Sequence, residues 1–276
     1  MNPRTAALFA DARAESRAAL IGYLPAGFPT IDASVALIDE MLAGGVDLVE
    51  VGLPYSDPLM DGVAIQDAVQ IALSEGTTTE DVLSIVERIS LSDSQAAVVM
   101  SYWNPIERFG LQSFVDRLAA AGGSGVITPD LTPEEAGPWI AATDSNDIDR
   151  TFLVAPSSTD ARIQTVAEAC TGFVYAASTM GVTGARDQVS NAAPTLVERV
   201  RERTTAPIGV GLGVSSADQA AGIAGYADGV IVGSAFVRRI LDAGDLAAAR
   251  ASVRAFAEEL AEGVRRPVDR IPVTAN

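Results

Sequence analysis

The chain has 276 residues, of which 48% are apolar, so it can bury a sizeable core. Its net charge of −17 argues against a surface for nucleic acid or an anionic membrane, because both need clustered positive charge. No apolar run is long enough to cross a bilayer and the first residues do not resemble a signal peptide, so we expect a cytoplasmic protein.

The sequence contains no histidine and no lysine, and all 19 basic residues are arginine. Arginine stays protonated at any working pH and is a poor proton shuttle. Schiff-base chemistry on lysine, histidine relays and histidine-ligated metals are therefore excluded. If the protein is an enzyme that transfers protons, carboxyl groups and tyrosines must do it.

Short apolar runs alternate with amphipathic segments from end to end. An extra helix is predicted around Arg4–Ala14, before the first apolar run. Between the apolar runs, apolar residues recur at helical spacing, as in the stripe of Ile31, Val35, Ile38 and Leu42. Eight runs rich in valine and isoleucine are too short to be helices and are predicted strands: Ala19–Leu24, Leu48–Gly52, Ala96–Met100, Gly125–Thr128, Thr151–Ala155, Phe173–Ala176, Ile208–Gly211 and Gly229–Val232.

Two local patterns complete the prediction of elements. Thr132 followed by Pro133-Glu134-Glu135 is typical of a helix N-cap and an acidic first turn. The single cysteine, Cys170, permits no intrachain disulfide, and its helical spacing indicates a buried thiol.

Eight strands, each followed by a helix, predict a single (β/α)₈ barrel, or TIM barrel, over residues 1–276, with an extra N-terminal helix. Strands buried on both faces explain why the runs are almost continuously apolar. The alternative is a doubly wound open sheet, but that fold usually has fewer strands and a glycine-rich first turn, which is absent here.

Glu50 lies inside the apolar run Leu48–Gly52. Alternation along a strand places it opposite to Val49 and Val51, so it faces the barrel interior if the valines face the helices. Burying a carboxyl group destabilises the folded state by roughly several kcal/mol unless the group is hydrogen-bonded, paired with a cation or protonated. We therefore expect a catalytic acid and base with a raised pKa, rather than a structural carboxylate held by an arginine or by backbone donors.

Asp61 lies on the proline-rich loop after the same run. An aspartate in a loop is more often a turn former than a catalyst. The position of Asp61 nevertheless favours a catalytic role, because the loop starts from the strand that carries Glu50. We expect Asp61 to be a second catalytic carboxylate.

Glycines follow three neighbouring predicted strands, in Gly181-Val-Thr-Gly184, Gly211-Leu-Gly213 and Gly233-Ser234. Backbone N–H groups exposed there can hold a phosphate without a cation, which suits a chain without lysine. Tight turns are the alternative interpretation of these glycines.

A second set of residues at strand ends could line a pocket for a flat aromatic group or simply cap the core: Tyr23, Met100, Tyr102, Tyr175 and Leu212.

These motifs closely resemble the tryptophan synthase alpha subunit family. The resemblance is carried by the run Glu50–Gln66, and further by Met100–Pro105, Pro129-Asp130 and the glycine motifs, in the same order over about the whole chain. It implies a (β/α)₈ barrel that cleaves indole-3-glycerol phosphate reversibly to indole and glyceraldehyde 3-phosphate, without a cofactor.

The resemblance also implies residue roles. Glu50 matches the general acid and base, and Asp61 matches the carboxylate that stabilises positive charge at the indole nitrogen. The remaining matches are indole-pocket positions (Tyr23, Met100, Leu212), a substrate-side hydroxyl (Tyr175), phosphate-site positions (Gly184, Gly213, Gly233, Ser234) and a loop residue that closes over Asp61 (Thr183).

The family works with a beta subunit in an α₂β₂ complex, and the beta subunit carries pyridoxal phosphate. The Asp57-Pro58 loop and the Asp130–Pro133 region correspond to the contact surfaces of the family. Three other hypotheses remain open: a free-standing lyase, a non-catalytic partner that binds the phosphate ligand, and an isomerase of a phosphorylated sugar-amine.

Overall fold

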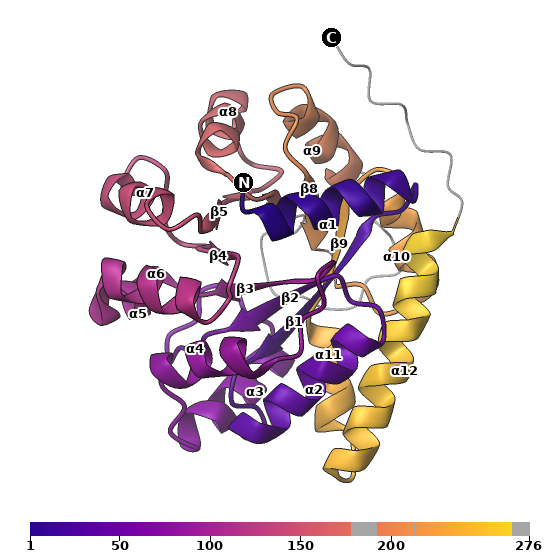
Figure 1. The fold of residues 1–276 in the computed structure, drawn as a ribbon. Helices are drawn as coiled ribbons and strands as arrows, with labels where there is room; N and C mark the ends of the chain where they lie inside the picture. Colours follow the sequence, from indigo (N-terminus) through magenta and orange to yellow (C-terminus); the bar gives the residue numbers. More distant parts are fainter. Residues whose placement is uncertain (178–191, 212, 267–276) are drawn as a thin grey trace.

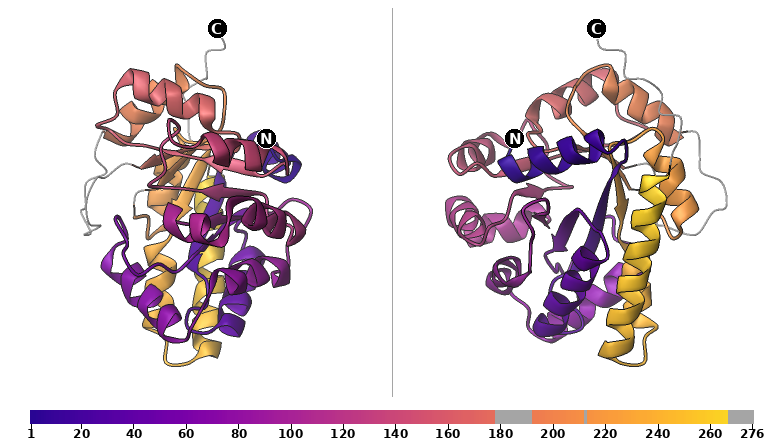
Figure 2. Two further views of the ribbon diagram at one scale, coloured as in Figure 1. Left: turned by 90° about the vertical axis from the view of Figure 1, so that its left-hand side faces the viewer. Right: turned by 45° about the vertical axis from the view of Figure 1, so that its right-hand side comes forward.

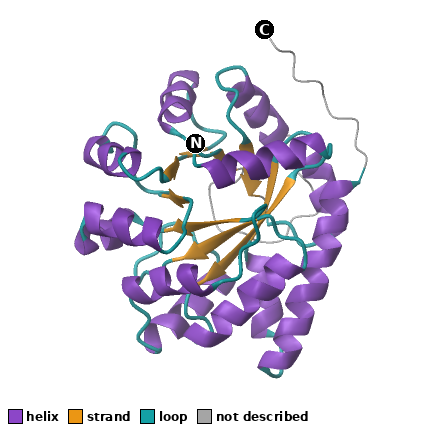
Figure 3. Cartoon of the chain, in the orientation of Figure 1, coloured by secondary structure: helices purple, strands orange, loops and turns teal. Residues whose placement is uncertain are grey.

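The computed structural model describes residues 1–177, 192–211 and 213–266, and these form a nearly closed barrel of parallel strands surrounded by helices (Figure 1; Figure 3). The strands are β1 (Ala19–Pro25), β2 (Leu48–Gly52), β3 (Ala96–Met100), β4 (Gly125–Ile127), β5 (Asp149–Thr151), β6 (Leu153–Val154), β7 (Val174–Ala177), β8 (Ile208–Gly211) and β9 (Gly229–Val232). Their order in the sheet is β5-β4-β3-β2-β1-β9-β8-β7-β6, and every pair is parallel.

One helix precedes the first strand, and the other described helices lie around the outside of the barrel. They are α1 (Pro3–Ala14), α2 (Ile31–Ala43), α3 (Val63–Ser74), α4 (Thr79–Arg88), α5 (Trp103–Phe109), α6 (Leu111–Ala120), α7 (Gly137–Asp144), α8 (Asp160–Ala169), α9 (Ala192–Arg201), α10 (Ala217–Ala224), α11 (Ser234–Leu241) and α12 (Leu246–Arg265). The long α12 packs on α2, α10 and α11 (Figure 2). Within the described ranges, no helix has the length and apolar character that crossing a membrane would need.

The two ends of the sheet, β5 and β6, together occupy the fifth strand position of an eight-stranded barrel. They are separated only by Phe152, where the chain changes partner from β4 to β7. The Phe152 N–H donates to the Cys170 sulfur (3.3 Å), while its carbonyl accepts from Tyr175 N (3.2 Å). The prediction of one strand over Thr151–Ala155 was therefore wrong in its bounds, although the predicted barrel is confirmed.

A second local prediction was also wrong. Helix α7 begins at Gly137 and not at Pro133, because residues 133–135 form a turn in which Glu135 N donates to Thr132 O (3.0 Å). Pro138 has no N–H to donate to the carbonyl four residues earlier, so a helix starting at Pro133 could not continue through it without losing a bond.

The interior of the barrel is filled by alternate residues of each strand. Val49 and Val51 belong to the outer core against the helices, whereas Leu48 belongs to the inner cluster, as the alternation in β2 predicts. The predicted N-terminal helix is confirmed as α1, which lies across the amino-terminal end of the strands (Figure 1). Its buried Leu8 and Phe9 join the inner cluster, and the Phe9 ring lies 5.9 Å from that of Phe173.

Replacing Phe9 by alanine removes the largest side chain with which α1 closes the barrel. We expect the free energy of unfolding to fall by about 3–5 kcal/mol, the usual cost of deleting a buried aromatic ring. Asp11→Ala on the exposed face of the same helix is the control and should change stability by less than about 0.5 kcal/mol. Equal losses in the two variants, measured by urea unfolding, would show that α1 does not plug the barrel.

Candidate active site

Glu50 is buried in the barrel interior, with 1% of its surface exposed. It is the third residue of β2 and pairs in register with Tyr23 of β1 and Val98 of β3. Among the described residues, Oε1 of Glu50 has no hydrogen-bond partner. Burial raises the pKa of Glu50 to about 8, because the ionised form loses its contact with water. The alternative of a carboxylate held by an arginine or by backbone donors finds no support in this environment.

Two tyrosines face the same interior. A Cβ atom added to Gly52 would lie 2.5 Å from the Tyr23 hydroxyl, and one added to Gly211 would lie 2.6 Å from the Tyr175 hydroxyl. The glycines at the ends of β2 and β8 therefore make room for the two rings. Gly52 was not predicted as part of the site, although a glycine within a strand often marks such a close approach.

Asp61 is held on the loop after β2, at the carboxyl end of the strands. Its backbone carbonyl accepts from Gln66 Nε2 (2.7 Å), and its carboxylate accepts from the Tyr102 hydroxyl (3.3 Å). Tyr102 is the residue before α5, on the loop that follows β3. Burial raises the pKa of Asp61, and the hydrogen bond from Tyr102 opposes this rise.

The electrostatic influences show that these side chains share one region. The pKa of the buried Tyr23 is raised well above 10 by burial, and further by the charges of Asp61 and Glu50. The same two carboxyl groups raise the pKa of Tyr175, after burial. Met100, the last residue of β3, packs on the same inner cluster as Tyr175. The structure thus brings together Tyr23, Glu50, Asp61, Met100, Tyr102 and Tyr175.

The described phosphate candidates lie at the ends of β8 and β9. Gly213 adopts a positive φ of +68°, and a Cβ there would meet open space. Gly233 is the N-cap of α11 and Ser234 its first residue. A Cβ on Gly233 would lie 3.2 Å from the Tyr23 ring, which places this helix start next to the side chains gathered around Glu50. The first N–H groups of a helix have no partner within it and can bind an anion.

Three of the predicted site residues, Thr183, Gly184 and Leu212, lie outside the described residues. Within the residues that the structure describes, no group of three or more His, Cys, Asp or Glu side chains could hold a metal ion.

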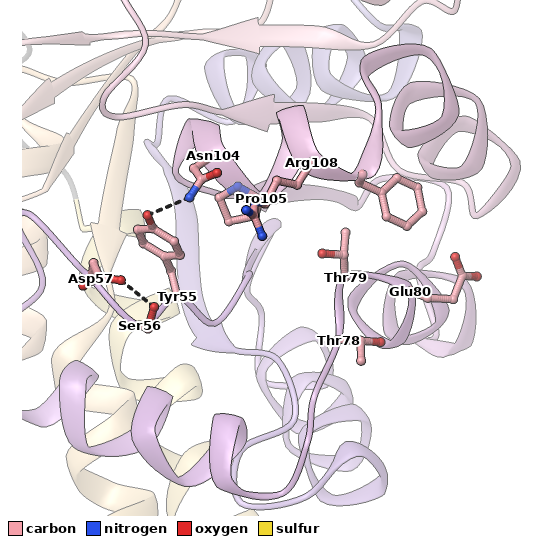
Figure 4. Close-up of a pocket in the computed structure, with 10 residues that line it drawn as sticks. Tyr55, Ser56, Asp57, Thr78, Thr79, Glu80, Asn104, Pro105 and Arg108 are labelled. Carbon is pink, nitrogen blue, oxygen red and sulfur yellow. Dashed lines mark hydrogen bonds between the residues drawn. The ribbon is translucent and has the colours of Figure 1, made fainter.

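A separate surface groove of about 530 Å³ lies outside this interior pocket, between the loop after β2, the start of α4 and helix α5 (Figure 4). Its floor contains Tyr55, whose hydroxyl accepts from Asn104 Nδ2 (3.1 Å), and Ser56, which donates to Asp57 (2.6 Å). The nearby Asp130 carboxylate accepts from Trp103 N (2.9 Å) and so caps the start of α5.

The fold and the pocket define a (β/α)₈-barrel protein with a buried carboxyl group and a glycine-rich helix start at the carboxyl ends of its strands. A family model described as tryptophan synthase alpha chain matches residues 9–265. The tryptophan synthase alpha chain of Thermobifida fusca is 58% identical over 259 residues, which cover 93% of this chain and 96% of the relative. That of Mycobacteroides abscessus is 58% identical over 263 residues, with 95% and 98% covered.

Solved structures agree with the sequence matches. A chain of Mycobacterium tuberculosis tryptophan synthase superposes with a TM-score of 0.90 at 52% identity, over 97% of this chain and 100% of that one. This chain therefore belongs to the tryptophan synthase alpha chain family.

The raised pKa of Glu50 makes stability depend on pH in a defined direction. Between the ordinary pKa of 4.5 and about 8, the unfolded chain ionises Glu50 while the folded chain keeps it protonated. Unfolding is therefore favoured by rising pH in this window, by up to about 1.4 kcal/mol per pH unit from this group. Relative to the parent, Glu50→Gln should become progressively more stable from about pH 5 to about pH 8.

Thermal or urea unfolding at several pH values measures this difference. The exposed Glu262→Gln on α12 is the control and should track the parent at every pH. A stability difference between Glu50→Gln and the parent that does not change with pH would mean that Glu50 is ionised in the folded protein throughout.

Proposed function

We propose that Glu50 is the general acid and base, and Asp61 the second carboxylate, in the reversible retro-aldol cleavage of indole-3-glycerol phosphate to indole and glyceraldehyde 3-phosphate. Cleavage of this substrate in tryptophan biosynthesis is the reaction of the family, so the protein is a lyase of that pathway. The observation that carries the assignment of Glu50 is its burial with no counter-charge in the part of the chain that the structure describes, which raises its pKa to about 8.

The reaction needs a proton at C3 of the indole ring before the carbon–carbon bond can break. Protonated Glu50 supplies it, and the positive charge spreads to the ring nitrogen, where the Asp61 carboxylate stabilises it. The resulting Glu50 carboxylate takes the proton of the hydroxyl group on the adjacent glycerol carbon. The carbon–carbon bond then breaks, its electron pair returns to the indole ring, and the aldehyde is released while Glu50 is protonated again.

The pocket residues divide into two groups in this proposal. Tyr23, Met100, Tyr102 and Tyr175 surround the indole and its side chain, while Leu212 and Thr183, which lie outside the described residues, keep the substrate-binding roles that the family resemblance implies. Gly184, Gly213, Gly233 and Ser234 hold the phosphate through backbone N–H groups and the serine hydroxyl. The open space beside Gly213 and the start of α11 next to Tyr23 support this placement.

The chemistry needs no cofactor in this chain, because the protonated indole ring itself accepts the electron pair. A beta subunit that carries pyridoxal phosphate is the proposed partner, in an α₂β₂ complex. The groove beside Tyr55, Asp57 and Asn104 lies on the loop that corresponds to the contact surface of the family, which supports it as a docking face. The biosynthetic role supports a cytoplasmic location.

Glu50→Gln should lose about 10²–10⁴-fold in turnover of indole-3-glycerol phosphate while it retains the fold and ligand binding, because the amide cannot transfer a proton. The measurement is indole release by the purified chain, alone and with a beta subunit. Glu262→Gln is again the matched control and should turn over like the parent. Near-parental rates in Glu50→Gln would remove Glu50 from the mechanism.

Gly213→Val should weaken binding of indole-3-glycerol phosphate roughly 10- to 100-fold, the loss expected when hydrogen bonds to a charged group of about 1.5–3 kcal/mol are disturbed. Free indole lacks the phosphate and should bind almost unchanged. Gly122→Val is the matched control, because Gly122 also has a positive φ (+82°) and open space around its Cβ position. Equal losses for both ligands in Gly213→Val would make Gly213 a simple turn residue.

A further inference from the structure

Tyr102 makes three hydrogen bonds through one hydroxyl oxygen. The backbone N–H groups of Leu59 and Met60 donate to it, at 3.1 and 3.2 Å. The hydroxyl in turn lies 3.3 Å from Oδ1 of Asp61. A tyrosine hydroxyl carries one proton, and two donors already point at its oxygen, so this proton is directed at the Asp61 carboxylate.

The turn that Tyr102 holds has little other support. The side chains of Leu59 and Met60 are 77% and 45% exposed, so apolar burial does not fix this turn. From the other side, among the described residues, the Asp61 carbonyl accepts a hydrogen bond from Gln66 Nε2 of α3 (2.7 Å). The Tyr102 ring itself is well placed to act as an anchor, because it is 5% exposed and packs on Tyr55 with ring centroids 5.4 Å apart.

From this geometry we propose that Tyr102 is a positioning residue: its hydroxyl fixes the Leu59–Met60 turn and aims the Asp61 carboxylate into the pocket. This inference rests on the proposed role of Asp61, and it gives Tyr102 a function different from lining the substrate pocket. The ring comes from the loop after β3 and Asp61 from the loop after β2, so the contact joins two neighbouring loops at the carboxyl ends of their strands.

The hydrogen bond also affects the charge of Asp61. It lowers the pKa of this carboxyl group against the effect of burial, and so favours the ionised form that stabilises a cationic indole. Among the described residues, the other titratable groups that share this region with Asp61 are Tyr23 on β1, Glu50 on β2 and Tyr175 on β7. The two tyrosines stay protonated far above neutral pH, and the pKa of Glu50 is about 8. The acid limb of a pH–rate profile, which lies below the pKa of Glu50, therefore reports the ionisation of the Asp61 carboxyl group.

The test is Tyr102→Phe, which keeps the ring and deletes only the hydroxyl. We expect kcat for indole release to fall about 10- to 100-fold with little change in KM, because a misplaced group costs rate more than binding. The acid limb of the profile should move to higher pH. Tyr226→Phe, assayed in the same isolated chain, is the matched control, since it removes a tyrosine hydroxyl that lies between α10 and β9 and has no hydrogen-bond partner among the described residues.

Two further measurements separate this inference from the proposed function. Amide hydrogen exchange at Leu59 and Met60 should become faster in Tyr102→Phe, whatever Asp61 does in the reaction. In an Asp61→Asn background, Tyr102→Phe should cause little additional loss of turnover. Unchanged exchange, a loss confined to KM, or fully additive losses in the double variant would overturn the positioning role. Full activity of Asp61→Asn, with faster exchange in Tyr102→Phe, would instead overturn the role of Asp61.

Discussion

The rest of this structure depends on one unfavourable constraint, the burial of the Glu50 carboxyl group inside the barrel with no counter-charge among the described residues. Apolar strands surround it, and α1 closes the amino-terminal end of the barrel below it. In such surroundings the ionised form loses the hydration that it has in water, so the pKa rises and the carboxyl group stays protonated until a base takes the proton. The packing that fills the barrel is therefore also what makes Glu50 a suitable proton donor.

Asp61 shows how the same barrel gives a second carboxyl group a different environment. It lies on a loop, is partly exposed, and accepts a hydrogen bond from Tyr102 that favours its charged form. Burial raises the pKa of both carboxyl groups, but only at Asp61 does a hydrogen bond from Tyr102 oppose the rise. Two acidic residues in different surroundings can divide the work of an acid and of a charge stabiliser.

Much of the fold could be predicted from local pattern. The β2 and β3 runs were predicted with their observed bounds, because buried parallel strands are short and almost continuously apolar. The fifth strand was misplaced because it starts at the polar pair Asp149-Arg150 and is interrupted where Phe152 bonds to Cys170, a contact between residues 18 positions apart. Long-range hydrogen bonds of this kind leave no periodic signal.

For the site, the sequence by itself determined which chemistry was available: without histidine or lysine, proton transfer was left to carboxyl groups and tyrosines, and alternation in β2 turned Glu50 inward. Only the tertiary structure decided how those groups meet. The packing of Tyr23 against Gly52 and the hydrogen bond of Tyr102 to Asp61 each join different strands or loops. Such contacts are set by the register and closure of the barrel, because residues far apart in sequence become neighbours only when parallel strands align their carboxyl ends.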